Sequence, residues 1–137
     1  MQLSCIILVL MSENFRQTKT RQTMIGILSD SKAPVSALDI INTFKNLGIK
    51  VHKTTIYRDL DQFSELGLIE EIDFGDGIKR FELSNLGHHH HLICQSCKNV
   101  EDIEVEDEQI IENLPGLKDF KITRHSLEIF GLCGRCQ

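Results

Sequence analysis

The sequence predicts an α+β fold in two parts, and three observations support that prediction. In the first half, apolar residues recur at the three- and four-residue spacing of amphipathic helices. Two alternating runs on either side of Gly75-Asp76-Gly77 then predict a β-hairpin. In the second half, alternating runs around a helical segment predict a small α/β domain, and two Cys-X-X-Cys pairs predict a metal site within it. The pairs are Cys94 with Cys97 and Cys133 with Cys136.

Two helices are expected at the start of the first half. Residues 17–29 carry apolar side chains on one face, which is typical of a helix packed on a core. Pro34 then interrupts the chain, and Ser36 is a suitable N-cap for a second helix with a regular apolar face. Gly48 ends the second helix, because glycine readily adopts the backbone conformation that follows a helix.

A third helix is expected from Lys53 to Gly67, followed by the hairpin strands 68–74 and 78–83. Three helices and a hairpin in this order form a winged helix-turn-helix. One side of the third helix is apolar, and the other carries side chains that can contact base edges and phosphates. We therefore predict that it reads DNA; a capping segment with solvated charges is the alternative. The candidate DNA-binding residues are Lys53, Thr54, Thr55, Tyr57 and Arg58.

The charges are distributed unevenly along the chain. The formal net charge is −5, from 15 basic and 20 acidic residues, which does not by itself indicate a nucleic-acid partner. Residues 42–58 hold four basic and no acidic residues, whereas residues 101–112 hold seven acidic and no basic ones. This split favours a polyanionic partner for the first half and cations for the second.

The apolar run at residues 5–10 predicts neither a membrane span nor a leader. A bilayer requires about 20 apolar residues, and a signal peptide begins with basic residues that are missing here. Met11 follows the run and precedes a polar stretch, so we expect residues 1–11 to be a mis-assigned start or a disordered extension. Cysteines paired as metal thiolates indicate a reducing cytoplasm.

The second half should contain strands at 99–105 and 120–130, with a helix over 106–114 between them. Pro115-Gly116 stops this helix, and the cysteine pairs lie at strand ends. Four thiolates with two-residue spacers suit a closed, structural Zn²⁺ site. A redox-active Cys-X-X-Cys pair is the alternative, but the presence of two pairs without a thioredoxin pattern disfavours it.

The run His88-His89-His90-His91 ends two residues before the first cysteine pair. Successive side chains of a strand point to opposite faces, so His88 and His90 should face one way and His89 and His91 the other. Each pair needs further ligands, and imidazole with carboxylate suits Zn²⁺, Fe²⁺, Mn²⁺ or Ni²⁺. A solvated histidine-rich strand is the alternative. The available partners are Glu82, Asp102, Glu108 and His125.

Three segments carry a resemblance to a known family. They read Thr54-Thr55-Ile56-Tyr57-Arg58-Asp59-Leu60 with Gly67-Leu68-Ile69, His88-His89-His90-His91-Leu92-Ile93-Cys94-Gln95-Ser96-Cys97, and His125-Ser126-Leu127-Glu128-Ile129-Phe130-Gly131-Leu132-Cys133. In this order they resemble the ferric uptake regulator (Fur) family over residues 14–137. Members of that family are dimeric bacterial repressors in which a divalent metal closes the dimer onto a palindromic operator.

The resemblance implies a role for each cluster. It implies structural zinc on Cys94, Cys97, Cys133 and Cys136. It implies a sensory metal, iron or zinc with manganese or nickel as further possibilities, on Glu82, His89, His91 and Asp102. It implies an additional metal site on His88, His90, Glu108 and His125. For DNA, Tyr57 and Arg58 match the family's recognition pair, and Arg16 lies where a basic residue approaches the minor groove.

The expected α+β architecture therefore has three segments. An apolar start at 1–11 precedes a winged helix-turn-helix DNA-binding domain at 12–83. A small α/β metal-binding dimerisation domain with the four-cysteine zinc site follows at 84–137. The expected function is metal-dependent repression of metal uptake or homeostasis genes by a homodimer bound to double-stranded DNA.

Two positions depart from the family pattern and leave the sensory metal open. Many members place a histidine ligand two residues before the cap of the second helix, where this chain has Pro34. Neither Pro34 nor its neighbour Ala33 can bind a metal. His90 stands where iron-type members often carry Asp, so the additional site is richer in nitrogen. Iron sensing, zinc sensing and peroxide sensing are all compatible with these residues.

A zinc-dependent hydrolytic enzyme is the alternative from another functional class. It would use the histidines as an open catalytic site, but the chain lacks a His-Glu-X-X-His motif. That reading also leaves the winged helix unexplained, so we expect no enzymatic activity. A metal-binding adaptor without DNA binding is a third hypothesis, which Lys53, Tyr57 and Arg58 disfavour.

Overall fold

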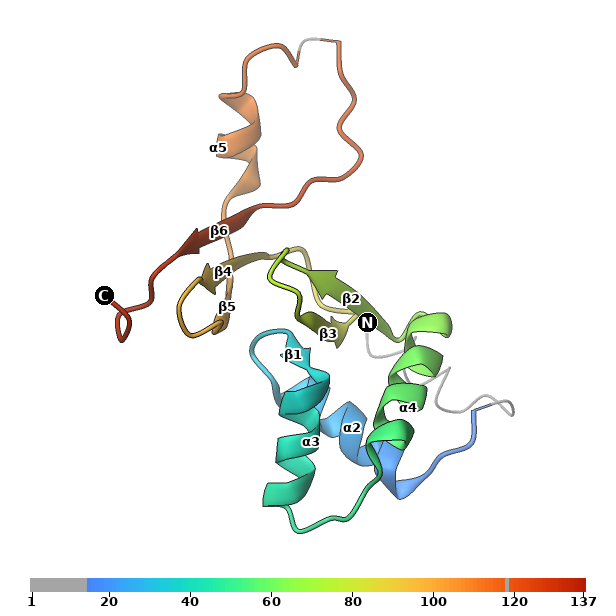
Figure 1. Ribbon diagram of the computed structural model, residues 1–137. Coiled ribbons are helices and arrows are strands. Elements are labelled where there is room, and N and C mark those ends of the chain that lie inside the picture. Colours follow the sequence, from blue (N-terminus) through green and yellow to red (C-terminus); the bar gives the residue numbers. More distant parts are fainter. Residues whose placement is uncertain (1–14, 118) are drawn as a thin grey trace. The chain divides into compact units, whose positions relative to one another are not determined.

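In the computed structural model, residues 15–117 and 119–137 are described, and the chain divides into two compact units (Figure 1). The first unit ends at Gly87 and the second comprises His88–Gln137. The apolar start predicted at 1–11 lies outside the described residues. Within the described part of the chain, no helix has the length and apolar character needed to cross a membrane.

In the described part of the first unit, the three predicted helices are present: α2 (Lys19–Asp30), α3 (Ala37–Asn46) and α4 (Lys53–Glu65). Side-chain caps define two of their starts. Thr18 accepts a hydrogen bond from the backbone of Arg21 at the start of α2. At α3, Ser36 and Asp39 form a reciprocal capping box, which satisfies backbone N–H groups that the helix itself leaves free.

The wing is an antiparallel sheet in the order β1-β3-β2, from β1 (Val35–Ser36), β2 (Ile69–Asp73) and β3 (Lys79–Leu83). The hairpin of β2 and β3 was predicted. The two-residue strand β1 was not, because two residues carry no alternation. By pairing with β3, β1 ties the chain between α2 and α3 to the wing.

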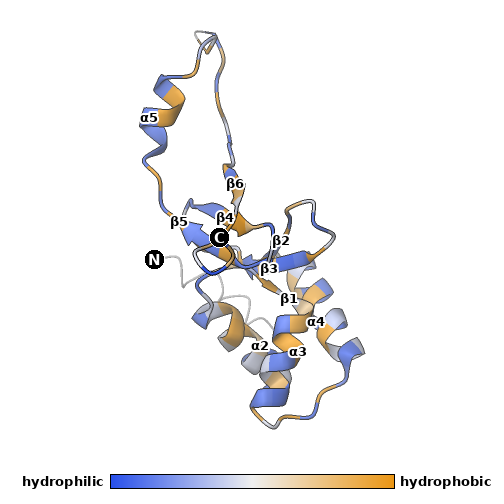
Figure 2. Cartoon of the chain, turned by 60° about the vertical axis from the view of Figure 1, so that its left-hand side comes forward, coloured by the Kyte–Doolittle hydropathy of each residue, from blue (hydrophilic) through white to orange (hydrophobic). Residues whose placement is uncertain are grey.

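The core of the first unit lies between the three helices and the wing. Both apolar and polar residues occur on each helix (Figure 2), and the apolar side chains of the three helices supply most of the core. Burial of such side chains is the main stabilising term, at roughly 1.5–3 kcal/mol for each large one. The most completely buried hydrophobic side chains are Met24, Ile40, Phe44, Ile56, Leu60 and Phe63.

The second unit contains a sheet in the order β5-β4-β6 and one short helix. Its elements are β4 (His90–Cys94), β5 (Val100–Ile103), α5 (Asp107–Glu112) and β6 (Glu128–Gly131). Strand β4 is central, antiparallel to β5 and parallel to β6. The predicted strand over 120–130 is therefore wrong for most of its length. Alternation indicates an extended chain, but a strand also needs a partner. Among the described residues, the pairing with β4 covers 128–131, and the His91 N–H also donates to the Leu127 carbonyl at 3.3 Å.

A buried ion pair stabilises the wing. The turn residues Gly75 and Gly77 both have φ of +77°, a conformation that favours glycine. Between them, Asp76 accepts two hydrogen bonds from the Arg80 guanidinium at 3.2 and 2.9 Å. Arg80 is only 4% exposed, and its guanidinium also lies 5.3 Å from the Phe74 ring centroid. The pKa of Asp76 lies below 3.8, and the hydrogen bond from Arg80 is the largest cause of this shift.

Replacement of Asp76 by Ala should lower the free energy of unfolding by about 3 kcal/mol, because it removes the carboxylate bound to a buried guanidinium. A lowered carboxyl pKa contributes stability above pH 3.8, and that contribution disappears as the pH falls through the folded-state value. The difference between the variant and the wild type should therefore shrink in acid. Urea denaturation at neutral and at acidic pH measures both effects.

Glu71→Ala is the matched control. Glu71 pairs with Lys79 at 2.9 Å in the same hairpin, but both side chains are solvent-exposed. Its loss should cost no more than about 1 kcal/mol. Equal losses for the two variants would contradict the role given to the Asp76–Arg80 pair.

Candidate metal centres and nucleic-acid interface

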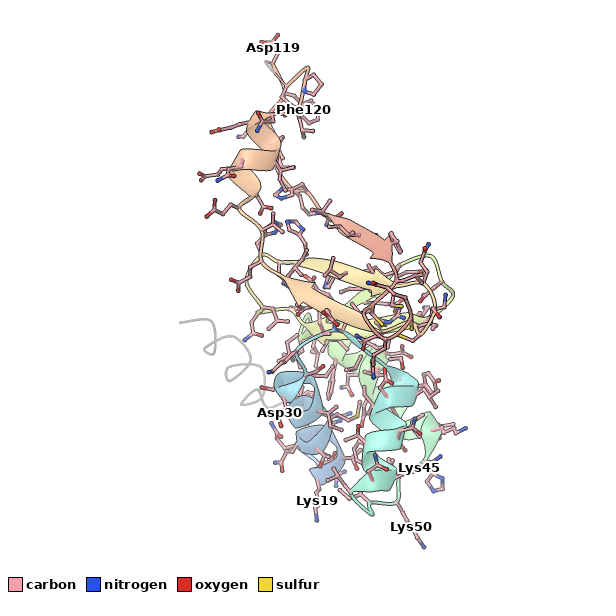
Figure 3. The ribbon with its side chains drawn as sticks, turned by 90° about the vertical axis from the view of Figure 1, so that its left-hand side faces the viewer. Lys19, Asp30, Lys45, Lys50, Asp119 and Phe120 are labelled. Carbon is pink, nitrogen blue, oxygen red and sulfur yellow. The ribbon has the colours of Figure 1, made fainter. Side chains whose placement is uncertain are left out.

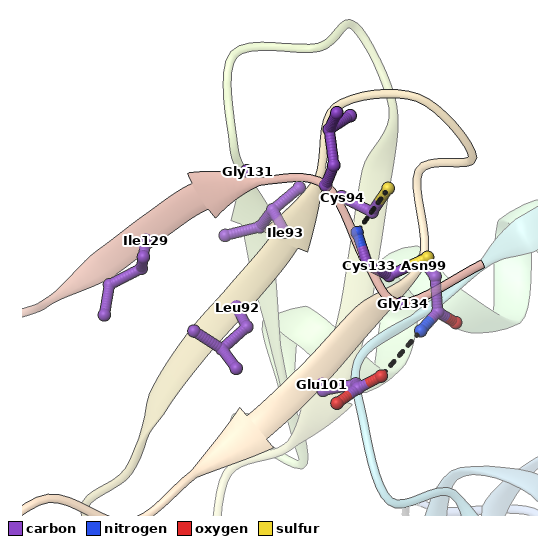
Figure 4. A pocket seen from close by; sticks show the side chains of 10 residues that line it. Leu92, Ile93, Cys94, Asn99, Glu101, Ile129, Gly131, Cys133 and Gly134 are labelled. Atoms are coloured by element: carbon purple, nitrogen blue, oxygen red, sulfur yellow. Dashed lines mark hydrogen bonds between the residues drawn. The ribbon is translucent and has the colours of Figure 1, made fainter. Parts of the chain in front are cut away.

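The four cysteines of the second unit meet at one end of its sheet. Their sulfurs lie within 4.8 Å of one another. Cys94 ends β4, while Cys133 and Cys136 follow β6, and Figure 4 shows Cys94 and Cys133 facing each other. The sulfurs of Cys97 and Cys133 are 3.8 Å apart. A tetrahedron with Zn–S bonds of about 2.3 Å has edges of about 3.8 Å, so this donor set fits zinc.

Backbone N–H groups and neighbouring side chains shift the pKa values of the cysteines in opposite directions. The Cys133 N–H donates to Cys94 Sγ at 3.4 Å, and this bond is the first cause that lowers the pKa of Cys94 to about 6. For Cys136, the Ser96 hydroxyl lowers the pKa, but the neighbouring Cys133 and Cys97 thiols outweigh it and raise the value to about 11. Zinc binds thiolates, so loading the site releases protons.

A second cluster gathers three histidines around one carboxylate. Asp107, the first residue of α5, lies 2.7 Å from His88 Nε2, 2.6 Å from His90 Nε2 and 3.2 Å from His125 Nε2. The hydrogen bond with His90 is the main cause that lowers the pKa of Asp107 below 3.8. Burial acts in the opposite direction, and the hydrogen bond with His125 lowers the pKa further. His90 is 1% exposed, and its Nδ1 accepts a hydrogen bond from the Leu127 N–H. That bond directs Nε2 of His90 towards the cluster.

The carboxylate in this cluster is Asp107, whereas the sequence reasoning named Glu108. Glu108 is exposed and does not belong to the cluster of His88, His90 and His125. Adjacent helical residues are rotated by about 100°, so only one of the two carboxylates can face the histidines. The acidic run contains four carboxylates between 104 and 108, and its composition could not identify which one faces inward.

A third cluster lies on the other side of β4. His89 Nε2 is 3.8 Å and His91 Nε2 is 3.4 Å from the carboxylate of Asp102. Asp102 stands opposite His91 in the β4–β5 register, so strand pairing brings the two together. The four histidines thus separate into the two pairs expected from strand alternation. Glu82, the fourth residue predicted for this group, lies buried in β3 of the first unit.

The predicted DNA-reading residues lie on the outer side of α4. Lys53, Thr54, Tyr57 and Arg58 are exposed and Thr55 is half-buried, while Ile56 and Leu60 point into the core. Arg16, before α2, is also exposed. Lys45, in the last turn of α3, and Lys50, in the connection to α4, are labelled in Figure 3. Both line one hollow with Lys53 at the start of α4, so the three positive charges lie close together.

The sequence reasoning missed an ion pair beneath this surface. Arg21 of α2 binds Asp59, which directly follows Arg58 in α4, at 3.0 Å. Asp59 is 2% exposed. Asp59 lies next to Leu60 on the apolar side of α4, which is a weak indication that it is buried. A buried carboxylate needs a charged partner, but that partner lies 38 residues away and cannot be identified from the sequence.

Comparison with known proteins gives concordant matches across both units. A model of the ferric uptake regulator family matches residues 12–130. The ferric uptake regulation protein of Bacillus subtilis (strain 168) is 35% identical over 135 residues, covering 91% of this chain and 87% of that protein. The peroxide-responsive repressor PerR of Staphylococcus aureus (strain USA300) is 32% identical over 123 residues, covering 89% of this chain and 82% of the relative.

Solved structures agree in fold. The ferric uptake regulator of Vibrio cholerae superimposes with a TM-score of 0.77 at 28% identity, covering 92% of this chain and 98% of that one. A zinc-bound manganese uptake regulator gives a TM-score of 0.78 at 28% identity, covering 87% and 91%. The predicted α+β class, with a winged helix-turn-helix and a four-cysteine cluster, is confirmed.

Replacement of Cys136 by Ala should remove zinc from the purified chain. The wild type should retain about one tightly held zinc ion per chain, because four thiolates form a closed site. Elemental analysis after dialysis against a mild chelator measures the content. Cys5→Ala, which lies outside both cysteine pairs, is the control and should keep its zinc. Full zinc content in the Cys136 variant would contradict the assignment.

Asp107→Asn should weaken metal binding at the three-histidine cluster by at least about tenfold, whereas Glu108→Gln should leave it unchanged. The reason is that Asp107 contacts all three imidazoles and Glu108 lies outside their cluster. Calorimetric titration with Mn²⁺ or Zn²⁺, in a background carrying His89→Ala and His91→Ala, isolates this site. Weaker metal binding by Glu108→Gln, with unchanged binding by Asp107→Asn, would identify Glu108 as the ligand instead.

Proposed function

Because the chain belongs to the ferric uptake regulator family, we propose that it is a repressor whose affinity for operator DNA depends on a divalent metal ion. One observation carries the proposal: the imidazoles beside the cysteine cluster separate into two groups, each with its own carboxylate. Mixed nitrogen and oxygen ligands suit exchangeable Fe²⁺, Mn²⁺, Ni²⁺ or Zn²⁺, whereas four thiolates suit permanent zinc. The clusters therefore divide into a structural site and candidate sensing sites.

The sensory site is formed by His89, His91 and Asp102, with Glu82 as the ligand from the first unit. Two neutral imidazoles, two carboxylates and a divalent ion sum to zero charge. Without the ion, two carboxylates brought together repel each other. Metal therefore favours the arrangement in which Glu82 lies beside the histidines, and this restrains the wing that carries it.

DNA binding uses the exposed side of α4. Tyr57 and Arg58 read base edges in the major groove, and Lys53 with Thr54 and Thr55 contacts phosphates and neighbouring base edges. Arg16 approaches the minor groove. A homodimer presents two α4 helices about one DNA turn apart, so its operator is palindromic. Operator binding must tighten metal binding by the same factor by which metal tightens operator binding.

The homodimer is supported by the exposed apolar residues of the second unit. Helix α5 has no buried residue, and every residue of β6 is exposed. A unit of this size with so few buried side chains gains stability from bound zinc and from association, and a second copy would cover these exposed surfaces. The exposed apolar residues are Ile110, Leu114, Phe120, Ile129, Phe130 and Leu132.

Peroxide sensing is the second candidate, and Asp102 favours it as a carboxylate ligand beside two imidazoles. The similarity to the repressor PerR of Staphylococcus aureus is consistent with this alternative. Fe²⁺ reacts with peroxide by one-electron transfer, whereas Mn²⁺ does not. Peroxide-dependent release of DNA from the Fe²⁺-loaded chain, but not from the Mn²⁺-loaded chain, would identify this function. The family assignment favours either regulator over a zinc hydrolase.

The direct test is selection of duplexes from a random-sequence library by the metal-loaded chain, followed by titration of the selected duplex. Buffered Fe²⁺, Mn²⁺, Ni²⁺ and Zn²⁺ are compared with chelator. The cognate ion should raise affinity roughly 5- to 150-fold, the usual range for coupled binding. Absence of any metal-dependent duplex binding would exclude the proposal.

Glu82→Ala should abolish the metal dependence of duplex binding while leaving the structural zinc in place. The change removes the ligand that joins the metal to the DNA-binding unit. Glu101→Ala is the matched control, because Glu101 adjoins Asp102 in β5 but is exposed and lies outside the cluster. A Glu82 variant whose affinity still rises with metal as in the wild type would remove Glu82 from the coupling mechanism.

A further inference from the structure

The guanidinium of Arg21 joins two segments that the proposed function assigns to DNA. Its Nε and Nη2 donate to Asp59 Oδ1 at 3.1 and 3.0 Å, and Nη2 also donates to Gln62 Oε1. Its Nη1 donates to the backbone carbonyl of Arg16 at 3.0 Å. One side chain of α2 therefore binds the recognition helix α4 at two points and holds the residue expected at the minor groove.

The surroundings of Arg21 shield this junction from solvent and pack against it. The Arg21 side chain is 12% exposed and the Asp59 side chain 3%, so the ion pair is largely shielded from water. The guanidinium lies 5.0 Å from the ring centroid of Phe15, and that ring lies 5.8 Å from the ring of Phe63 in α4. Phe15, which is 4% exposed, thus anchors the chain immediately before Arg16.

We infer that Arg21 is a positioning residue for DNA recognition, which holds the arm Phe15-Arg16 at a fixed place relative to α4. The inference rests on the proposed function. The backbone of Arg16 is anchored by its carbonyl, while its side chain is exposed and available to DNA. Asp59 directly follows Arg58, so the same guanidinium connects the arm to the turn of α4 that carries Tyr57 and Arg58.

The arrangement has a specific consequence for DNA binding. An arm fixed relative to α4 enters the minor groove without an additional ordering cost when α4 enters the major groove. If the arm is released, ordering it on DNA costs conformational entropy, and the Arg16 contact contributes less to the binding free energy. Only a guanidinium can maintain the junction, because its planar fork reaches two acceptors on α4 and the Arg16 carbonyl at once.

A double-mutant comparison separates positioning from simple stabilisation. The probe is a duplex selected from a random-sequence library by the Mn²⁺-loaded wild type. The affinity lost on Arg16→Ala is measured in the wild type and in the variant Arg21→Met/Asp59→Leu. Replacing both partners leaves no buried charge behind, so this variant should fold, which thermal unfolding checks. Arg21→Lys, which keeps the charge but not the fork, provides a second background if folding fails.

Arg16→Ala should weaken duplex binding at least about tenfold in the wild type, as expected for a well-placed Arg contact, and less than about twofold in either altered background. The matched control is Arg80→Met/Asp76→Leu, which removes another buried Arg–Asp pair of the same unit. There the Arg16 effect should remain about tenfold, because this wing pair does not hold the arm.

Three results would overturn the inference. An equal Arg16 effect with and without the Arg21–Asp59 pair would make the pair purely structural. An Arg16→Ala change without effect in the wild type would leave no arm contact to position. Loss of the Arg16 effect in the wing control as well would show a general response to destabilisation. If the wild type selects no duplex, the proposed function itself fails, and this inference with it.

Discussion

The alternation of side chains along β4 is the constraint on which the second unit depends. This central strand begins at His90, ends at Cys94 and pairs with β5 on one edge and β6 on the other. Its pleat places His90 towards Asp107 and His91 towards Asp102. A shift of the register by one residue would exchange the two groups and separate both from their carboxylates. The metal chemistry of the unit is therefore a property of strand pairing.

The cysteine cluster holds this register in place. Cys94 continues β4 into the cluster, and Cys133 follows β6, so a single zinc ion bound there joins the ends of both strands. Zinc bound by four thiolates has no open position and exchanges slowly. Ligands of mixed nitrogen and oxygen release their ion more readily. In the proposed function, the permanent zinc ion thus maintains the strand register on which the exchangeable metal sites depend.

The features that could be predicted from the sequence are those determined by short-range rules. Helix caps, the hairpin turn, the Cys-X-X-Cys pairs and the separation of the histidines all depend on residues a few positions apart. The features that were missed depend on contacts distant in the sequence. Residues 120–127 alternate like a strand, but in the described part of the chain the assigned strand begins only at Glu128. The direction in which α5 begins places Asp107, and not Glu108, beside the histidines.

The Arg21–Asp59 pair illustrates the same limit at the surface proposed to read DNA. Nothing near Arg21 in the sequence distinguishes it from a solvated basic residue. Its role follows only from the packing of α2 against α4, which buries Asp59 and brings the Arg16 carbonyl within reach of the same guanidinium. A buried carboxylate in a helix that approaches DNA would repel phosphates if it were not neutralised. Pairing with Arg21 neutralises that charge, so in the proposed DNA complex the exposed positive charges of Lys53 and Arg58 would face the phosphates without this repulsion.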